Sequence, residues 1–257
     1  MHLPIYVIHS PSLPERAIHV SHEMERTKLN WEWVTAYEVG EISPEIEGKW
    51  FTPGSKLSAR QKSCALKHIV ALEAIRDRDC ERAIVFEDDI ILCKNFISQL
   101  SRAMDESRSW KRPFVMDIGS ATNFYTPADK LKNGSMLYAG AKRRNAEAYL
   151  IGSLEASLRL EWLAKHKITE PIDIEFNHCD AILGISIIWT EPPLAEQGSL
   201  TGKFKSSLDP KRRSHLKLRL QFPIQKFRRK YLKRWTNASR LSIRRIWRST
   251  ILDKTKH

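Results

Sequence analysis

The first forty residues alternate between apolar runs and polar segments in a way that predicts a βαβ unit. Residues 3–9 are mostly apolar and predict a first strand, and residues 31–36 predict a second. Between them, Ser12 and Glu15 have the spacing of a helix capping box, with Pro14 just inside the helix start. Apolar side chains then recur at helical spacing, at Leu13, Ala17, Val20 and Met24. A strand, a helix and a second strand in this order build a parallel sheet.

The strand and helix order continues after a loop that we predict at residues 40–56, which are rich in proline and glycine. Ser58 and Gln61 form a second capping box, and the helix behind it extends to about residue 79. One face of that helix carries Ala65, His68, Leu72 and Ile75. Further strands are predicted at 114–118, 148–152 and 185–189, with a helix at 154–166. The fold class that this order predicts is α/β, with a Rossmann-type, mostly parallel sheet, helices on both faces and a ligand site at the carboxyl ends of the strands.

Three adjacent acids, Glu87, Asp88 and Asp89, lie between two purely apolar stretches. Carboxylates at the end of a buried strand are costly unless a cation, a basic partner or water neutralises them. Alternation along an extended chain places Glu87 and Asp89 on one side and Asp88 on the other, so one divalent ion can be held by the first pair. Oxygen ligands of this kind suit magnesium or manganese bound together with a substrate phosphate. The alternative is an acid-rich surface turn or helix cap.

Charge is distributed unevenly along the chain. The formal net charge is +13, but residues 201–257 contain 19 Lys and Arg against two Asp, so the remainder is slightly acidic. We therefore place a globular domain at residues 1–202 and a basic tail at residues 203–257. Apolar side chains recur in the tail at helical spacing, at Ile224, Phe227, Tyr231 and Trp235, which predicts a basic amphipathic helix.

Three interpretations of this tail remain open. An anionic membrane surface is favoured, because basic residues near such a bilayer contribute on the order of 1 kcal/mol each and the aromatic face can enter the interface. Nucleic acid is the second, although no recognised binding module accompanies the charge and no specific nucleic acid is expected. A solvated tail is the third.

The cellular compartment is predicted from cysteines and apolar runs. The cysteines have no C-x-x-C spacing, which favours a reducing compartment; they are Cys64, Cys80, Cys93 and Cys179. The first eight residues lack a basic segment typical of a signal peptide, and no run of 18 apolar residues occurs. We expect a cytoplasmic protein, peripheral on the inner membrane.

Several short motifs appear in the order and spacing typical of bacterial glycosyltransferase family 25, which this chain resembles over residues 4–200. They are Arg16 after the first strand, Val34-Thr35-Ala36, Cys64-Ala65-Leu66-Lys67-His68, Phe86-Glu87-Asp88-Asp89-Ile90, Ala148-Tyr149-Leu150-Ile151, Pro171-Ile172-Asp173 and Pro192-Pro193-Leu194-Ala195-Glu196-Gln197. The resemblance implies a GT-A fold, an acidic triplet acting as the D-x-D metal motif, a nucleotide-sugar donor that is usually UDP-galactose, and a lipooligosaccharide or lipopolysaccharide core acceptor. This chain departs from the family's usual residues at two positions, with Lys67 in place of Ser and Glu147 in place of small residues. We expect both changes to affect the donor or acceptor pocket.

Roles for the acidic residues follow from the transfer reaction. Glu87 and Asp89 are the candidate ligands of a manganese or magnesium ion, which stabilises the leaving diphosphate. Asp88 is expected to bind the ribose or sugar hydroxyls, or to accept a backbone hydrogen bond. Asp173 is the candidate base that takes the acceptor proton in an inverting displacement, with Asp180 and Glu175 as fallbacks. The alternative for Asp173 is that it caps the following helix.

Three further residues are candidates for contacts with the donor. His68 either hydrogen-bonds a donor phosphate, braces the acidic triplet, or is a core histidine satisfied by a backbone carbonyl. Arg16 either pairs with the nucleotide or is a solvated helix residue. Gln197 is expected to reach the cleft from its loop.

We therefore expect a metal-dependent, inverting glycosyltransferase that moves a hexose, with galactose the expected sugar, from a UDP-sugar to a lipid-linked core oligosaccharide. The alternative is a nucleic-acid or polyanion binding protein in which the acidic triplet is structural. A metal-dependent phosphohydrolase is a third class, but the sequence shows no second cluster of metal ligands.

Overall fold

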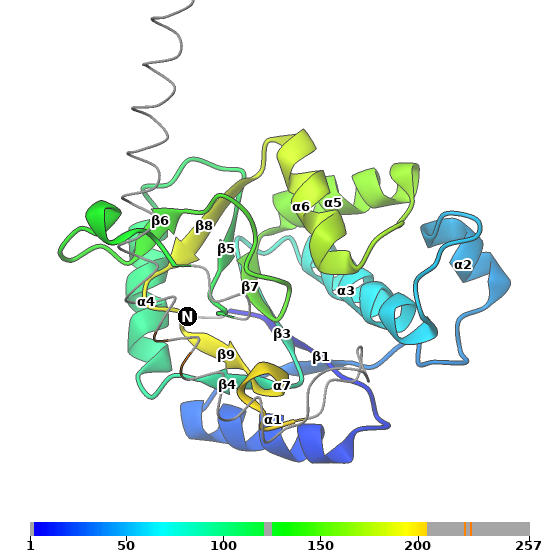
Figure 1. Ribbon diagram of the computed structural model, residues 1–257, viewed down its shortest axis with the longest axis horizontal. Helices are drawn as coiled ribbons and strands as arrows, with labels where there is room; N and C mark the ends of the chain where they lie inside the picture. Colours follow the sequence, from blue (N-terminus) through cyan, green and yellow to red (C-terminus); the bar gives the residue numbers. More distant parts are fainter. Residues whose placement is uncertain (1–2, 121–124, 205–223, 225–226, 228–257) are drawn as a thin grey trace, which may run out of the picture.

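A seven-stranded mixed sheet forms the centre of the computed structural model, which describes residues 3–120, 125–204, 224 and 227. Its strand order is β2-β1-β3-β7-β5-β8-β6 (Figure 1). Five strands run in one direction, whereas β7 and the edge strand β6 run antiparallel to their neighbours. The strands are β1 Ile5–Ile8, β2 Glu32–Val34, β3 Ala83–Glu87, β5 Phe114–Asp117, β6 Leu137–Ala139, β7 Ala148–Ile151 and β8 Ser186–Thr190. The chain is therefore α/β with a mainly parallel sheet, as the sequence predicts.

A short two-stranded sheet lies beside the end of β3. It pairs β4 (Ile90–Leu92) antiparallel with β9 (Ala195–Gln197). This pairing brings the segment around Gln197 next to the acidic residues that follow β3. The helices are α1 Pro14–Thr27, α2 Pro44–Trp50, α3 Ala59–Asp77, α4 Phe96–Ser107, α5 Ser153–His166, α6 Ile172–Leu183 and α7 Gly198–Thr201, with a 3₁₀ turn at Ala128–Lys130.

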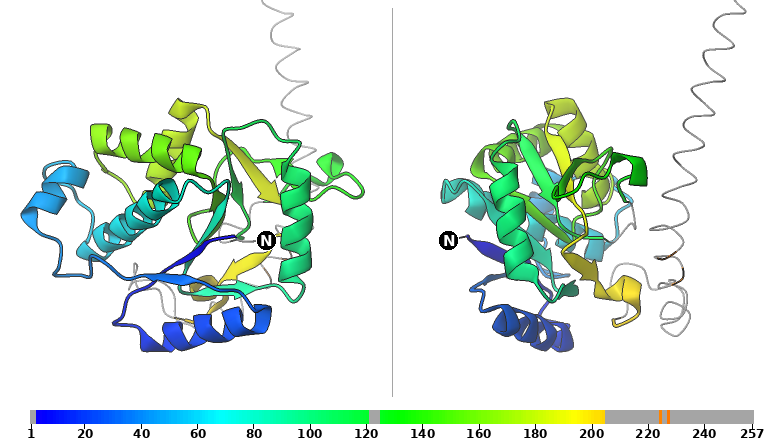
Figure 2. Two further views of the ribbon diagram at one scale, coloured as in Figure 1. Left: turned by 180° about the vertical axis from the view of Figure 1, so that it is seen from behind. Right: turned by 90° about the vertical axis from the view of Figure 1, so that its left-hand side faces the viewer.

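Helices cover both faces of the sheet, because its strands alternate apolar side chains between two cores. Val85 and Tyr149 face one core, which they share with residues of α3, α5 and α6. Phe86 and Leu150 face the other, which they share with residues of α1 and α4. Figure 2 shows α4 and the group of α3, α5 and α6 on opposite sides of the sheet.

Most elements lie where the sequence predicts them. The opening βαβ unit is confirmed, with β1 and β2 parallel, and so is the capping box of Ser58 and Gln61. The capping box predicted at Ser12 is wrong, because the helix begins at Pro14 after Leu13 and has no side-chain cap. The loop predicted at 40–56 contains α2, whose first turn is capped by Ser43.

The two residues that follow Gly202 still pack against the domain. The Lys203 ammonium lies 2.9 Å from His19 Nδ1 on α1, and the Phe204 ring packs on the His19 ring. The predicted division at 202 and 203, and the amphipathic helical tail, stay predictions, because most of the tail lies outside the described residues. Within the described part of the chain, no helix has the length and apolar character needed to cross a bilayer.

Candidate active site

The acidic residues lie at the carboxyl end of β3, in the middle of the sheet. Val85 faces the α3 side and Phe86 faces the α1 side, so Glu87 continues toward α3. The strand ends at Glu87, and a turn carries Asp88 and Asp89 to β4. The predicted strand with an acidic end is therefore confirmed.

Asp88 is held by groups at the carboxyl end of β1 and on α1. Its Oδ1 accepts a hydrogen bond from Arg16 Nη1 at 2.6 Å, and its Oδ2 lies 2.8 Å from His9 Nδ1. The backbone N–H of Ser10 also points at Oδ2, at 3.4 Å. Burial alone raises the pKa of this carboxyl, but the His9 hydrogen bond and the Arg16 charge outweigh it and lower the pKa. Asp88 is therefore an ionised, braced carboxylate.

Asp89 is buried where β4 begins, against the start of α7. Its Oδ2 accepts a hydrogen bond from the backbone N–H of Ser199 at 3.0 Å, and its carbonyl oxygen accepts one from Gly198. Its Oδ1 is buried and has no hydrogen-bond partner. Burial raises the pKa of Asp89 against the opposing positive charge of Arg16, and the negative charge of Asp88 adds to the rise.

Glu87 has the most perturbed carboxyl of the three. Its Oε2 accepts a hydrogen bond from Gln197 Nε2 at 3.2 Å, which confirms that Gln197 reaches this site. Burial raises the pKa of Glu87 well above its usual value, and nearby carboxylates raise it further. These are Asp89, Glu147, Asp88 and Asp173. Neighbouring negative charge therefore adds to the effect of burial at Glu87.

Glu147 is a fourth carboxylate of this group, and it comes from the residue before β7. Its carbonyl oxygen accepts the backbone N–H of Glu87 at 2.9 Å, and its side chain is 1% exposed. A Cβ atom at Gly119 would lie 2.1 Å from Glu147 Oε1, so glycine at that position leaves room for the carboxylate. Glu87, Asp88, Asp89 and Glu147 are called the acidic cluster below.

His68 is a fully buried residue of α3 beneath the acidic cluster. Its Nδ1 is 3.1 Å from the Tyr149 hydroxyl, and its Nε2 is 3.7 Å from Glu87 Oε1 and has no hydrogen-bond partner. Burial lowers the pKa of His68 to about 3, and the charges of Arg143 and Arg159 act in the same direction. The imidazole is therefore neutral, and its side-chain contacts differ from the carbonyl-bonded core histidine that was one alternative.

The three candidate bases occupy different environments. Asp180 is buried and forms a two-point ion pair with Arg159, at 2.8 and 2.6 Å. Glu175 Oε1 accepts hydrogen bonds from Thr169 and from the backbone N–H of residue 170. Both alternative candidate bases therefore already have hydrogen-bond partners within the fold. Asp173 is half-buried in the first turn of α6, one residue beyond the helix start, and its charge acts on Glu87.

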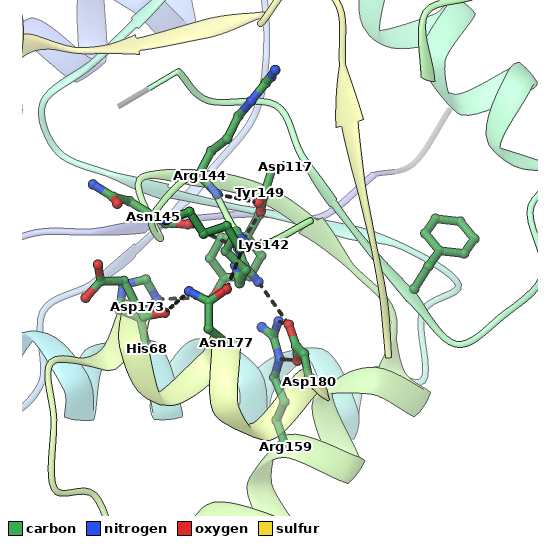
Figure 3. A network of polar contacts seen from close by, with 12 residues as sticks. His68, Asp117, Lys142, Arg144, Asn145, Tyr149, Arg159, Asp173, Asn177 and Asp180 are labelled. Carbon is green, nitrogen blue, oxygen red and sulfur yellow. Dashed lines mark hydrogen bonds and ion pairs between the residues drawn. The ribbon is translucent and has the colours of Figure 1, made fainter. Parts of the chain in front are cut away.

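A second group of buried charges, which we call the arginine network, lies next to His68 (Figure 3). Arg143 Nη2 contacts Asp117 at 2.7 Å, and the Arg143 guanidinium lies 4.5 Å over the Tyr149 ring. Asn177 on α6 contacts this network, since its Oδ1 accepts the Arg143 backbone N–H. The network comprises Arg143, Arg144 and Arg159 with Asp117, Asp180 and Glu191.

Two sets of side chains carry donor atoms of the kind that a divalent cation takes. Glu87 and Asp89 have carboxylate oxygens of the type that suits magnesium or manganese, and Asp89 Oδ1 has no hydrogen-bond partner. Cys64, His68 and Glu87 place one ligand atom each within 4.8 Å of one another. Burial raises the pKa of the Cys64 thiol well above its usual value, and the charges of Glu87 and Asp88 contribute. The excess negative charge favours a cation in either case.

The sequence analysis gave no role to Cys64 or Tyr149, although both lie in the motifs quoted there, and it linked Glu147 to the donor or acceptor pocket through the family resemblance alone. The helical spacing of Cys64 and His68, four residues apart, was the available signal that they share a face. Glu147 gave no signal of its own, because its closeness to Glu87 depends on the antiparallel pairing of β7 with β3.

A comparison with protein-family models gives a match that includes the acidic cluster. The sequence model of glycosyltransferase family 25, described as an LPS biosynthesis protein, matches residues 2–147 and so includes the whole acidic cluster. Asp173 and Gln197 lie beyond the matched residues. A search of curated proteins finds no match. Because the family match covers more than half of the chain, this protein belongs to glycosyltransferase family 25.

Proposed function

We propose that this glycosyltransferase is a metal-dependent, inverting enzyme of GT-A type that moves a hexose from a UDP-sugar to a lipopolysaccharide or lipooligosaccharide core. Galactose is the sugar we expect, because it is usual in the family that the sequence motifs resemble. The observation that carries the proposal is the excess of buried negative charge at the carboxyl end of β3, which raises the pKa of Glu87.

Glu87 and Asp89 are the proposed ligands of a manganese or magnesium ion. Burial raises both pKa values, at Asp89 against the opposing charge of Arg16, and a bound cation would stabilise the two carboxylates as anions. A bound ion of this kind supplies positive charge to the diphosphate leaving group as the bond to the sugar breaks. The hydrogen bonds from Gln197 and Ser199 orient the two carboxylates.

Arg16, Asp88 and His68 are proposed to form the donor side of the site. The side chains of His9 and Arg16 converge on Asp88 at the carboxyl end of β1, where nucleotides bind in α/β sheets. Arg16 also carries a positive charge next to the position expected for the donor phosphates. His68, kept neutral by burial, lies beneath Glu87, with its Nε2 at 3.7 Å from Glu87 Oε1.

Asp173 is the proposed general base. It is half-buried and its charge is felt at Glu87, whereas Asp180 and Glu175 are committed to other contacts. In the inverting displacement, an Asp173 oxygen accepts the proton of the acceptor hydroxyl while that hydroxyl attacks the sugar carbon. The base must lie on the side opposite the leaving diphosphate.

The central test is sugar transfer by the full-length chain from a panel of UDP-sugars to purified lipopolysaccharide core. We expect turnover with manganese or magnesium, loss of turnover with EDTA, and recovery when metal is restored. Asp89→Asn should lower kcat by about 10²–10³-fold, by analogy with removal of one electrostatic stabiliser. Asp105→Asn, which changes an exposed acid of α4, is the matched control. Full turnover in EDTA or in Asp89→Asn would refute the metal role.

The basic tail is proposed to hold the enzyme on the cytoplasmic face of the inner membrane, next to its lipid-linked acceptor. Its sequence charge supports this proposal, with 19 Lys and Arg in residues 201–257. Replacing Lys226, Arg229 and Lys230 by Glu should reduce co-sedimentation with anionic vesicles and leave transfer to a soluble acceptor unchanged. Equal vesicle binding by the variant would contradict the proposal, and tight RNA binding would favour the nucleic-acid alternative.

A further inference from the structure

Glu87 belongs to a second group of potential metal ligands besides the acidic pair. Cys64 and His68 lie four residues apart on α3, so their side chains share one face of the helix and both approach Glu87. The Cys64 sulfur, a His68 ring nitrogen and a Glu87 carboxylate oxygen all lie within 4.8 Å of one another. Sulfur, nitrogen and oxygen donors together form the ligand type that zinc prefers.

The state of the His68 ring independently indicates a missing ligand. Its side chain is fully buried, yet Nε2 has no hydrogen-bond partner and points toward Glu87 Oε1 at 3.7 Å. An unpartnered polar atom in the interior costs free energy. The other ring nitrogen is 3.1 Å from the Tyr149 hydroxyl, which is the kind of contact that orients a metal-binding histidine.

The site is also reachable from solvent. The Glu87 side chain is 19% exposed, and Cys64 is partly exposed, whereas His68 closes the inner side. Three protein ligands leave a fourth position of a tetrahedral ion open to water.

We propose that Cys64, His68 and Glu87 bind a zinc-class cation, and that this cation inhibits sugar transfer by withdrawing Glu87 from the magnesium or manganese ion. The Cys64 thiol gives up its proton to solvent when the ion binds. The inhibition rests on the proposed function, whereas the binding of zinc does not. The site therefore makes sugar transfer sensitive to thiophilic cations.

Cobalt titration of the metal-free, full-length protein tests the binding. Co²⁺ is a spectroscopic substitute for zinc, and a thiolate ligand gives it a charge-transfer band in the near ultraviolet. We expect this band in the wild type and its bleaching when zinc is added. Cys64→Ser and Cys64→Ala should remove the band and weaken zinc binding by more than about 100-fold, since even the loss of outer contacts weakens metal sites by 10–100-fold. Cys93→Ser, a partly exposed cysteine elsewhere, is the matched control.

Two outcomes overturn the proposal, namely no charge-transfer band in the wild type, or a band that persists in both Cys64 variants. Inhibition is measured separately, as loss of manganese-dependent transfer on addition of zinc, and it should be much weaker in Cys64→Ala than in Cys93→Ser. If the band appears but no UDP-sugar is turned over, the proposed function fails and the zinc site stands. If transfer requires manganese but no band appears, the zinc site is refuted and the proposed function stands.

Discussion

The two buried groups of charge that meet at His68 differ in how their charge is compensated. In the arginine network, three guanidinium groups face three carboxylates, and the Arg159 and Asp180 side chains join at two points, 2.8 and 2.6 Å. In the acidic cluster, the Arg16 and His9 contacts both go to Asp88, and the pKa of Glu87 is raised by burial and by other carboxylates. The first group has equal formal charges of both signs, whereas carboxylates predominate in the second.

This difference separates a structural role from a functional one. A compensated network is stable as folded but is damaged when one partner is lost, because the other charge is then buried alone. A cluster with excess charge of one sign is strained without a ligand, and loses strain when one charge is removed. Stability and activity should therefore respond in opposite ways to substitutions in the two groups.

The largest loss of stability is expected from breaking the arginine network. Arg159→Met leaves the buried Asp180 carboxylate without its two-point partner and should lower the free energy of unfolding by about 3–5 kcal/mol. Urea denaturation followed by circular dichroism measures this. The double variant Arg159→Met with Asp180→Asn should recover part of the loss, since the orphaned charge is gone. A single variant as stable as the wild type would show that the pair contributes nothing.

The opposite result is expected in the acidic cluster. Glu87→Gln resembles the protonated side chain that a raised pKa favours, so the metal-free variant should be as stable as the wild type or slightly more stable. The folded protein holds this proton more tightly than the unfolded chain, so wild-type stability falls as the pH rises through the raised pKa, and Glu87→Gln should remove that fall.

Adding manganese gives a second comparison of the wild type with Glu87→Gln. At 100 times the dissociation constant, an ion that binds only the folded state adds about 2.7 kcal/mol of stability, which should appear as a rise in Tm of the wild type. Glu87→Gln should lose this rise together with the transfer activity. A variant that is strongly destabilised without metal would mean that Glu87 is a structural residue.

The pH dependence of stability tests the environment of His68, which lies between the two groups. Its pKa is lowered to about 3 by burial and by Arg143 and Arg159, whereas a histidine in the unfolded chain titrates near 6.5. As the pH falls from 6.5 toward 3, this histidine is protonated in the unfolded chain but stays neutral in the folded protein. Stability is therefore lost over this pH range. His68→Gln should flatten this dependence by up to a few kcal/mol, at about 1.4 kcal/mol per pKa unit. His22→Gln, an exposed histidine of α1, should leave it unchanged.

The local parts of this structure were predictable from the sequence, because they depend on short-range patterns. The purely apolar run that ends at Phe86 predicted the strand that carries Glu87, and the spacing of Ser58 and Gln61 predicted the start of α3. The α2 helix was missed since Gly48 lies within it and prolines stand nearby, while the cap that begins it is a single Ser43 side chain.

The contacts of the site that residue patterns alone did not predict depend on long-range pairing. Glu147 joins the acidic cluster only because β7 enters the sheet antiparallel, between β3 and β5. The engagement of Asp180 depends in the same way on Arg159, which comes from a different helix. Charge neutrality is a property of three-dimensional neighbours, so a sequence with no alignment cannot distinguish a paired buried acid from an unpaired one.

The smallest change in stability is expected at Asp173, where the two groups and the proposed chemistry come closest. Its negative charge in the first turn of α6 favours the helix by about 0.3–1 kcal/mol, and it also raises the pKa of Glu87, so Asp173→Asn removes one favourable and one unfavourable interaction. Denaturation should therefore show nearly unchanged stability. If Asp173 is the base, kcat nevertheless falls by about 10²–10⁴-fold while manganese still raises Tm, because metal binding does not require the proton acceptor. Loss of the manganese effect in Asp173→Asn would instead assign this carboxylate to the metal site.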